Sequence, residues 1–296
     1  MRFRGVVAAK LALLIYKDRR EWFKTIPYND NNRRGCMRLH IKKRNLILGL
    51  VLIFAVGAVF YLKAQYVVPV LMYHKIDENS ESSRLSVSPR SFKRQMYFLK
   101  THKYNVVRLE DLAILIKKDN VPAKTIAITF DDGYEDNYKI AYPMLKELGL
   151  NATIFIVPSM IGIDGYLTWP EVIEMSESGI ISIGSHTMTH AWLPDQPEQK
   201  LDSQILDSKR AIESHIRKKI YSFSYPLGGF NENIRRKVIG AGYSIAVTTN
   251  PGKKYPKHDL FAMKRLRISK TSDNLAVFWF EITGLYTWIK EHRDKD

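Results

Sequence analysis

The stretch TIAITFDDG, residues 125–133, joins an apolar run to two acidic residues and a glycine. An almost unbroken apolar run, as in residues 125–130, is typical of a parallel strand buried on both faces. Asp131 and Asp132 follow at the end of this predicted strand, and Gly133 allows the chain to turn there. The stretch therefore predicts a parallel α/β fold with carboxylates at a strand end.

Similar strands recur along the chain, separated by amphipathic segments. The other predicted strands cover residues 67–73, 152–157, 180–184, 222–224, 243–248 and 265–269. One predicted helix begins at Ser88-Pro89. The others cover residues 137–148, 171–178, 198–218 and 231–241. Alternating strands and helices imply a parallel sheet with helical crossovers. So many units in about 230 residues fit a closed (β/α) barrel better than a two-layer sandwich.

The polar motifs of the chain lie where predicted strands end. IGSHTMTH (183–190) and FSYPLGG (223–229) follow this rule in the same way as TFDDG. Catalytic residues of parallel barrels lie at the carboxyl ends of the strands. We therefore expect these motifs to meet at one end of the barrel.

Asp132, His186 and His190 form a candidate set of metal ligands. Two histidines four residues apart point the same way on a helix or a tight loop, so both imidazoles could bind one ion. Two histidines and a carboxylate leave positions open for water and substrate, as catalytic metal sites do. One divalent ion is expected, with zinc as the default and cobalt, nickel or iron as alternatives. Asp131 would then stay free to accept a proton, although an isolated Asp-Asp-Gly is more often a solvated turn.

The net charge of +16 is concentrated at the N-terminus. Residues 1–44 contain 13 Lys/Arg and 3 Asp/Glu, a balance of +10, which leaves +6 for residues 45–296. Nucleic-acid binding fits this distribution poorly, because the excess precedes an apolar segment. Cys36 is the only cysteine and precedes the apolar segment. The chain after that segment therefore has no cysteine and forms no disulfide. Met37 begins a stretch that would make an ordinary signal anchor by itself, so we interpret residues 1–36 as an upstream extension or a misassigned start.

The apolar segment NLILGLVLIFAVGAVFYL, residues 45–62, has about the length needed to cross a bilayer. Basic residues precede it, so the positive-inside rule keeps the N-terminus cytoplasmic. We expect residues 1–44 to be a basic cytoplasmic arm and residues 45–64 a transmembrane signal anchor. Residues 66–296 would then form a domain on the extracytoplasmic side of the cell membrane. A buried helix is the alternative, and VGA at 56–58 leaves cleavage open.

Three motifs resemble those of a known enzyme family. TFDDGY (129–134), SHTMTH (185–190) and FSYPLGG (223–229) resemble the first three motifs of the polysaccharide deacetylases, carbohydrate esterase family four. VPVLMYHKI (68–76), LTWPEV (167–172) and AGYSIAVTTNPG (241–252) resemble the branch that includes poly-N-acetylglucosamine deacetylases. The resemblance covers roughly residues 67–270. It implies a distorted (β/α) barrel of the deacetylase type, preceded here by one N-terminal transmembrane helix.

The resemblance also implies roles for the motif residues. Asp131 corresponds to the general base, and Asp132, His186 and His190 to the metal ligands. Tyr225, Pro226 and Leu227 correspond to the substrate-binding third motif. The backbone N–H of Leu227 would help to stabilise the oxyanion.

Two family features are missing from the sequence. Ser224 stands where the third motif usually has an arginine that orients the base, so we expect Arg265 to replace it, with Arg267 as the second choice. The usual Leu-x-His motif that supplies the general acid is also absent. In the poly-N-acetylglucosamine branch this histidine corresponds to His74, although a buried core histidine is the competing interpretation.

Two aromatic features have structural alternatives as well. Trp169 could stack against a sugar ring or pack against the barrel rim. The aromatic segment 276–290 predicts a C-terminal packing helix, which we favour over contact with the membrane surface. His215 is expected to be a solvated surface residue.

The resemblance implies a metal-dependent N-deacetylase that releases acetate from N-acetylhexosamine polymers, such as poly-N-acetylglucosamine or a cell-wall glycan. Its partners would be this N-acetylated polysaccharide and the membrane, through residues 45–64. One alternative is a deacetylase or esterase of peptidoglycan or chitin oligomers. Another is a catalytically inactive carbohydrate-binding homologue.

Overall fold

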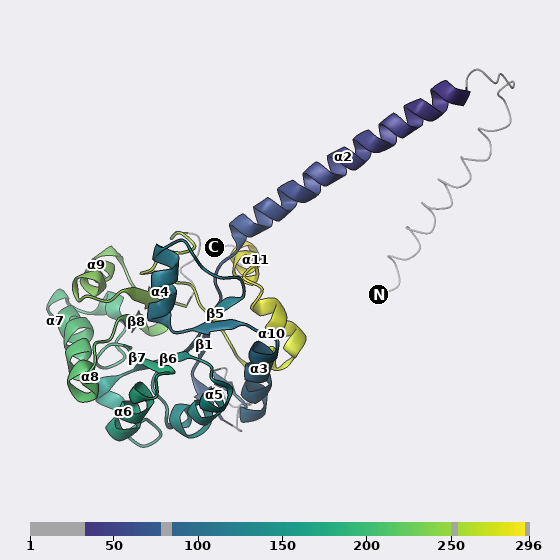
Figure 1. Cartoon of the computed structure of the whole chain (residues 1–296). Coiled ribbons are helices and arrows are strands. Elements are labelled where there is room, and N and C mark those ends of the chain that lie inside the picture. The colour runs from purple at the N-terminus through teal and green to yellow at the C-terminus, as the bar shows by residue number, and fades with distance from the viewer. Residues whose placement is uncertain (1–32, 78–84, 250–253, 294–296) are drawn as a thin grey trace, which may run out of the picture. The chain divides into compact units, whose positions relative to one another are not determined.

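The computed structural model describes residues 33–77, 85–249 and 254–293. The chain forms two units, one that ends at Tyr61 and one that begins at Leu62 (Figure 1). Most of the predicted basic arm, residues 1–32, lies outside the described residues.

The first unit contributes one long helix, α2 (Arg33–Gln65). Its part from Asn45 to Gln65 is 21 residues long, strongly apolar and not buried inside the protein. This segment is long and apolar enough to cross a membrane, as predicted for residues 45–64. The orientation across a membrane stays a prediction.

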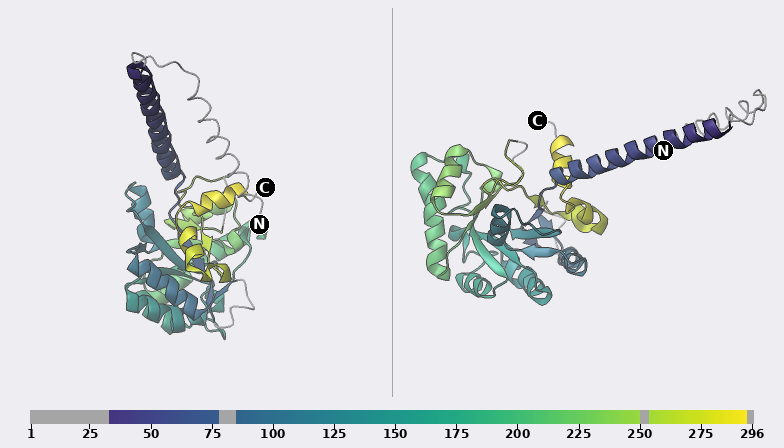
Figure 2. Two further views of the ribbon diagram at one scale, coloured as in Figure 1. Left: turned by 90° about the vertical axis from the view of Figure 1, so that its right-hand side faces the viewer. Right: turned by 45° about the horizontal axis from the view of Figure 1, so that its top comes forward.

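The second unit is built on a curled parallel sheet (Figure 2). Its strands are β1 (Val70–Tyr73), β4 (Asn105–Val107), β5 (Thr125–Phe130), β6 (Ala152–Ile156), β7 (Ile181–Ser185), β8 (Ser222–Ser224), β9 (Ile245–Val247) and β10 (Leu266–Arg267). The order is β10-β1-β5-β6-β7-β8-β9, with β4 paired to β5. A parallel bridge between Val247 and Met263 brings the segment before β10 against β9, so the ends of the sheet meet. The predicted barrel class is confirmed.

Helices cover the outside of the sheet (Figure 1). They are α3 (Pro89–Thr101), α4 (Leu109–Lys117), α5 (Tyr142–Leu148), α6 (Trp169–Glu177), α7 (Glu198–Asp202), α8 (Ser208–Ile216), α9 (Glu232–Gly240), α10 (Leu275–Glu281) and α11 (Tyr286–Arg293). Short 3₁₀ turns occur at η3 (Pro158–Met160), η4 (Leu193–Asp195), η6 (Pro226–Gly228) and η7 (Lys270–Asp273). A small separate pair joins β2 (Lys75–Ile76) and β3 (Ser86–Val87). Ser88 caps α3 as predicted, since its side chain accepts a hydrogen bond from the Ser91 N–H.

Strand β5 explains how the apolar run positions the site. Its residues are all buried, and alternate side chains point to opposite faces of the sheet. Ile126 and Ile128 join the larger apolar cluster, whereas Ala127 joins the smaller one. Thr129 and Asp131 have the same parity as Ala127, so that face becomes polar toward the end of the strand.

Three parts of the fold differ from the predictions. The helices predicted at 137–148 and 198–218 contain π-helical turns, η2 (Asn137–Ala141) and η5 (Ser203–Asp207). Strand β4 and helix α4 were not predicted. The single helix predicted at 276–290 is wrong, because the chain forms α10 and α11 instead. Gly284 separates them in a left-handed conformation, with φ of 77°, that disfavours other residues.

Gly184 in β7 offers a test of the packing that supports the site. A Cβ atom there would lie 2.5 Å from the Phe155 ring and 2.9 Å from the Ser222 carbonyl oxygen. We expect Gly184→Ala to lower the free energy of unfolding by about 1–3 kcal/mol, because neither β6 nor β8 can move away freely. Thermal unfolding of the full chain would measure this. Gly240→Ala is the matched control, since a Cβ there meets nothing within 4 Å. Equal stability of the two variants would contradict the packing described.

Candidate functional site

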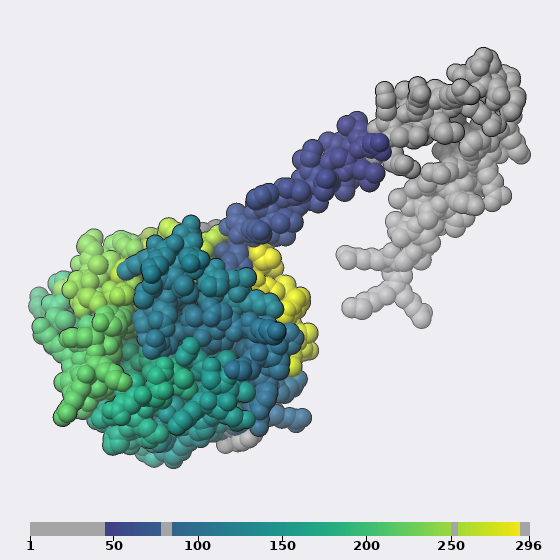
Figure 3. Space-filling model, viewed as in Figure 1, coloured from purple at the N-terminus to yellow at the C-terminus, as the bar shows by residue number. Residues whose placement is uncertain are grey.

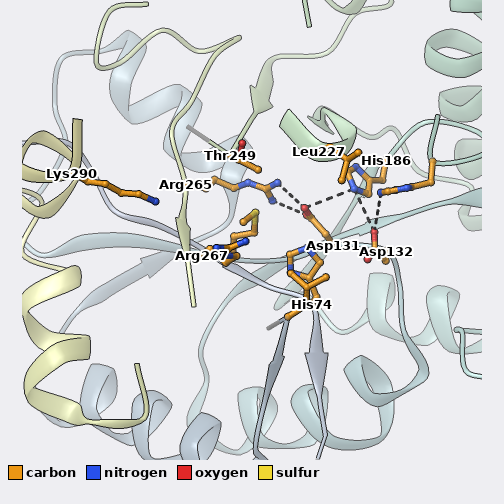
Figure 4. Close-up of a pocket in the computed structure, with 12 residues that line it drawn as sticks. His74, Asp131, Asp132, His186, Leu227, Thr249, Arg265, Arg267 and Lys290 are labelled. Atoms are coloured by element: carbon orange, nitrogen blue, oxygen red, sulfur yellow. Dashed lines mark hydrogen bonds and ion pairs between the residues drawn. The ribbon is translucent and has the colours of Figure 1, made fainter. Parts of the chain in front are cut away.

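A cavity of about 400 Å³ opens at the carboxyl ends of the strands. Figure 4 shows its residues pointing toward one another from different strand ends. The lining consists of Met72, His74, Leu85, Asp131, Asp132, His186, His190, Leu227, Thr249, Arg265, Arg267 and Lys290. The structure therefore brings together the predicted residues of the first two motifs, Leu227 of the third, His74 and Arg265.

Asp131 is held by a two-pronged ion pair with Arg265. The Nη1 and Nη2 atoms of Arg265 each donate to one Asp131 carboxylate oxygen, both at 2.6 Å. The three remaining guanidinium donors are also satisfied. Nε donates to the Thr248 carbonyl at 3.1 Å, Nη1 to Thr129 Oγ1 at 3.2 Å and Nη2 to Ser224 Oγ at 3.0 Å. Both partners of the pair are buried. This geometry fixes the orientation of the carboxylate in the cavity.

The ion pair keeps Asp131 ionised. Burial by itself raises the pKa of the Asp131 carboxyl, but the Arg265 charge, helped by His186, outweighs it. The pKa of Asp131 is therefore held well below its usual range. An ionised carboxylate in this position can accept a proton.

His186 is oriented by a backbone hydrogen bond. Its Nδ1 lies 2.8 Å from the Ser224 carbonyl oxygen, which can only accept, so Nδ1 carries the proton. Nε2 is then left with a free lone pair. Burial is the main cause that lowers the pKa of His186, and it favours the neutral ring that metal binding requires.

The candidate metal ligands converge on one point. Asp132 Oδ1 lies 3.5 Å from His186 Nε2 and 3.4 Å from His190 Nε2. The three ligand atoms all lie within 4.8 Å of one another. Asp132 Oδ1 is buried and has no hydrogen-bond partner among the described residues. A buried carboxylate oxygen without a donor is costly unless a cation compensates it, so these residues fit a divalent metal.

Unusual backbone conformations create this convergence. Asp132 has a φ of 74° and His190 a φ of 57°, and Thr187 between the histidines has a φ of 66°. Such left-handed residues other than glycine carry a local cost and cluster at functional sites. The turn at Asp132 also separates it from Asp131. Asp131 pairs with Arg265, and Asp132 lies against His190. His186 Nε2 is near both carboxylates, 3.8 Å from Asp131 Oδ2 and 3.5 Å from Asp132 Oδ1. The histidines lie on a loop after β7 rather than on a helix.

His74 lies directly after β1 and lines the cavity near Asp131 and Arg267 (Figure 4). Its Nδ1 is buried without a hydrogen-bond partner among the described residues. Burial lowers the pKa of His74, and the nearby Asp131 offsets part of that effect. Its carbonyl accepts a hydrogen bond from Asn137 Nδ2 at 2.9 Å, which fixes the backbone at this point. The geometry is compatible with a proton donor to a substrate in the cavity.

The third motif forms a tight turn at the cavity edge. Leu227 has a φ of 53°, and its side chain is 70% exposed. The N–H groups of Gly228 and Gly229 donate to the carbonyls of Tyr225 and Pro226. Leu227 lines the cavity, whereas the buried Tyr225 hydroxyl donates to the Phe261 carbonyl.

Three predicted substrate-binding residues do not line this cavity, namely Tyr225, Pro226 and Trp169. Trp169 starts helix α6, and its ring stacks on His215 with centroids 3.7 Å apart. His215 itself is exposed, as predicted. Thr249 and Lys290 line the cavity but are not among the predicted site residues. Thr249 lies within the quoted motif 241–252, whereas no motif marks Lys290.

Comparisons with known proteins agree with this site. A sequence model of the polysaccharide deacetylase family matches residues 118–246. The Bacillus subtilis protein YxkH, provisionally named a polysaccharide deacetylase, is 36% identical over 202 residues, which cover 68% of this chain and 71% of that protein. A poly-beta-1,6-N-acetyl-D-glucosamine N-deacetylase of Staphylococcus aureus is 27% identical over 197 residues, or 60% of this chain and 68% of that protein.

A solved structure shares both fold and sequence. The Streptococcus pyogenes deacetylase PplD, in complex with acetate, has a TM-score of 0.66 and 28% identity. The likeness covers 71% of this chain and 97% of that one. The similarity to the Bacillus subtilis protein covers 68% of this chain, and the barrel has the family's motifs at its strand ends. This chain therefore belongs to the polysaccharide deacetylase family.

Proposed function

We propose that this chain is a metal-dependent hydrolase that removes N-acetyl groups from an N-acetylhexosamine polymer, either poly-N-acetylglucosamine or a cell-wall glycan. The observation that best supports this proposal is that the two adjacent aspartates have different main partners. Asp131 is locked in an ion pair beside the cavity, whereas Asp132 faces two histidines. The name of the Staphylococcus aureus relative supports the polymer class.

Asp132, His186 and His190 would hold the divalent ion. Once bound, the ion would supply Lewis acidity toward the amide carbonyl and the attacking water. Zinc suits this set of nitrogen and oxygen ligands, and cobalt, nickel or iron could replace it.

The remaining residues would move protons and stabilise charge. Asp131 would take a proton from the water that attacks the acetyl carbon, while Arg265 holds the carboxylate in place. The Leu227 N–H, with Tyr225 and Pro226 shaping the turn, would donate to the developing oxyanion. The carbon–nitrogen bond then breaks, and protonated His74 would give its proton to the departing amine. The products are acetate and a free amino sugar.

The alternatives keep the same site but change the substrate or the outcome. A deacetylase or esterase of peptidoglycan or chitin oligomers would use the same residues on another glycan. An inactive carbohydrate-binding homologue is less favoured, because the candidate base and ligands are all present and brought together. Trp169 stays a proposed sugar contact only for a long polymer that extends beyond the cavity.

We also propose a single-pass location in the cell membrane. Residues 45–64 would act as the signal anchor and residues 66–296 as the catalytic domain on the extracytoplasmic side. The apolar helix and the basic residues before it support this arrangement.

Metal content tests the ligand set. We expect the chain to retain one divalent ion after dialysis, measured by elemental mass spectrometry. His186→Gln with His190→Gln should weaken binding by more than about 100-fold, since even changes next to metal ligands cost 10–100-fold. His215→Gln is the matched control, because His215 is exposed and outside the cavity. Unchanged binding in the double variant would exclude this site.

Acetate release tests the activity. The full chain in detergent should release acetate from N-acetylglucosamine oligomers after metal is removed and restored, but not before restoration. Asp131→Asn should abolish release while the bound metal remains, because it removes only the proton acceptor. Bound metal without acetate from these oligomers, peptidoglycan or chitin would favour the carbohydrate-binding alternative.

Arg265→Lys tests how the base is held. Lysine keeps the charge but loses the two-pronged contact, so the carboxylate should turn away. We expect kcat to fall about a hundredfold, with little change in KM or metal content. Arg267→Lys is the matched comparison, since Arg267 lines the same cavity. A larger loss in Arg267→Lys would transfer the role to that residue.

A further inference from the structure

Helix α10 turns an apolar face toward the surface. Consecutive helical residues are separated by about 100°, so Trp279, Ala276, Phe280 and Val277 follow one another along a continuous arc. All four are exposed, with Trp279 at 52%, Phe280 at 42% and Val277 at 39%. Phe278 points to the opposite side and is buried in the core. We call the four exposed residues the α10 face.

The composition of the α10 face is unusual for a helix that meets water. Exposed helix faces usually carry charged and polar residues, whereas the one acidic residue of α10, Glu281, is buried. The Phe280 ring meets the Tyr286 ring edge-on, with ring centroids 5.7 Å apart, yet Phe280 is still 42% exposed among the described residues. Figure 3 shows the C-terminal segment, in yellow, on the surface. Adjacent exposed aromatic residues of this kind mark an interaction surface.

The chain connects the α10 face directly to the apolar helix. The Val67 N–H donates to the Gly284 carbonyl at 2.8 Å. A Cβ atom on Gly284 would lie 2.2 Å from the Tyr66 ring, so the two segments are in close contact. The candidate membrane span ends at Gln65, immediately before this contact. Helix α10 ends at Glu281, three residues before Gly284.

These connections limit how far α10 can be from a bilayer. The path from Gln65 through the Val67–Gly284 hydrogen bond to Glu281 covers five residues, which span at most about 17 Å when extended. The polar layer on each side of the hydrocarbon core is about 5–8 Å thick, so the near end of α10 lies within reach of it. Tryptophan and other aromatic side chains are enriched in that layer. Exposed Lys63, in the last turn of α2, can extend its amine into the same layer.

We propose that the α10 face inserts into the interfacial layer of the bilayer from which the chain emerges. This inference rests on the proposed membrane anchoring, and it changes the sequence-based preference for a helix that only packs. It has a consequence for the site, because α11 follows α10 and contributes Lys290 to the cavity wall. A second contact beside the anchor would hold the cavity at a fixed height above the membrane.

Tryptophan fluorescence of the full chain in lipid nanodiscs tests the proposal. The difference in emission between wild type and Trp279→Phe reports on Trp279 alone, and phenylalanine preserves the apolar face. Lipids brominated near the headgroup should quench this difference emission more than lipids brominated near the chain end. The matched control is Trp169→Phe, whose ring stacks on His215. Its difference emission should not change with either lipid.

Difference emission that neither brominated lipid quenches would overturn the proposal. If that emission were blue-shifted, a second copy of the chain would cover the α10 face, and if red-shifted, water would. Alkaline carbonate extraction separates this outcome from a failure of anchoring. A chain that stays in the membrane pellet but shows no quenching contradicts only the α10 contact, whereas release into the supernatant contradicts the anchor itself.

Discussion

The buried ion pair between Asp131 and Arg265 is the interaction on which the site depends. Removing two charges from water is costly, and this pair offsets the cost with two direct contacts and further hydrogen bonds to Thr129, Ser224 and Thr248. Because Asp131 is held by Arg265, Asp132 is the carboxylate that lies against both histidines, whereas Asp131 is near only one of them, His186, at 3.8 Å. The two adjacent aspartates therefore acquire different chemistry from their partners alone.

The same ion pair connects the chemistry to closure of the sheet. Asp131 follows β5, whereas Arg265 lies just before β10 at the other end of the sequence. The Arg265 N–H donates to the Thr249 carbonyl beyond β9, and β10 then pairs with β1. Arg265 reaches Asp131 only when this seam is formed. A sheet that failed to close would leave a buried carboxylate without a partner, which is strongly destabilising.

The sequence was informative where the chemistry is carried by side chains at strand ends. The apolar run 125–130 predicts the central strand. Ser224 stands in place of the usual arginine, which predicts that Arg265 orients the base instead. Segments that depend on tertiary contacts were missed. The three-residue strand β4 has too little periodicity to detect, and the break at Gly284 follows from its contact with Tyr66. Lys290 lines the cavity from helix α11, far along the chain from the motifs, so no local pattern could reveal it.

We propose that Arg265 reserves Asp131 for proton transfer while Asp132 binds the metal. Anomalous diffraction from crystals of the zinc-loaded chain would test it most directly. We expect one anomalous peak within bonding distance of Asp132, His186 and His190, with the contact between Asp131 and Arg265 intact. A peak bonded to Asp131, with Arg265 displaced, would contradict it.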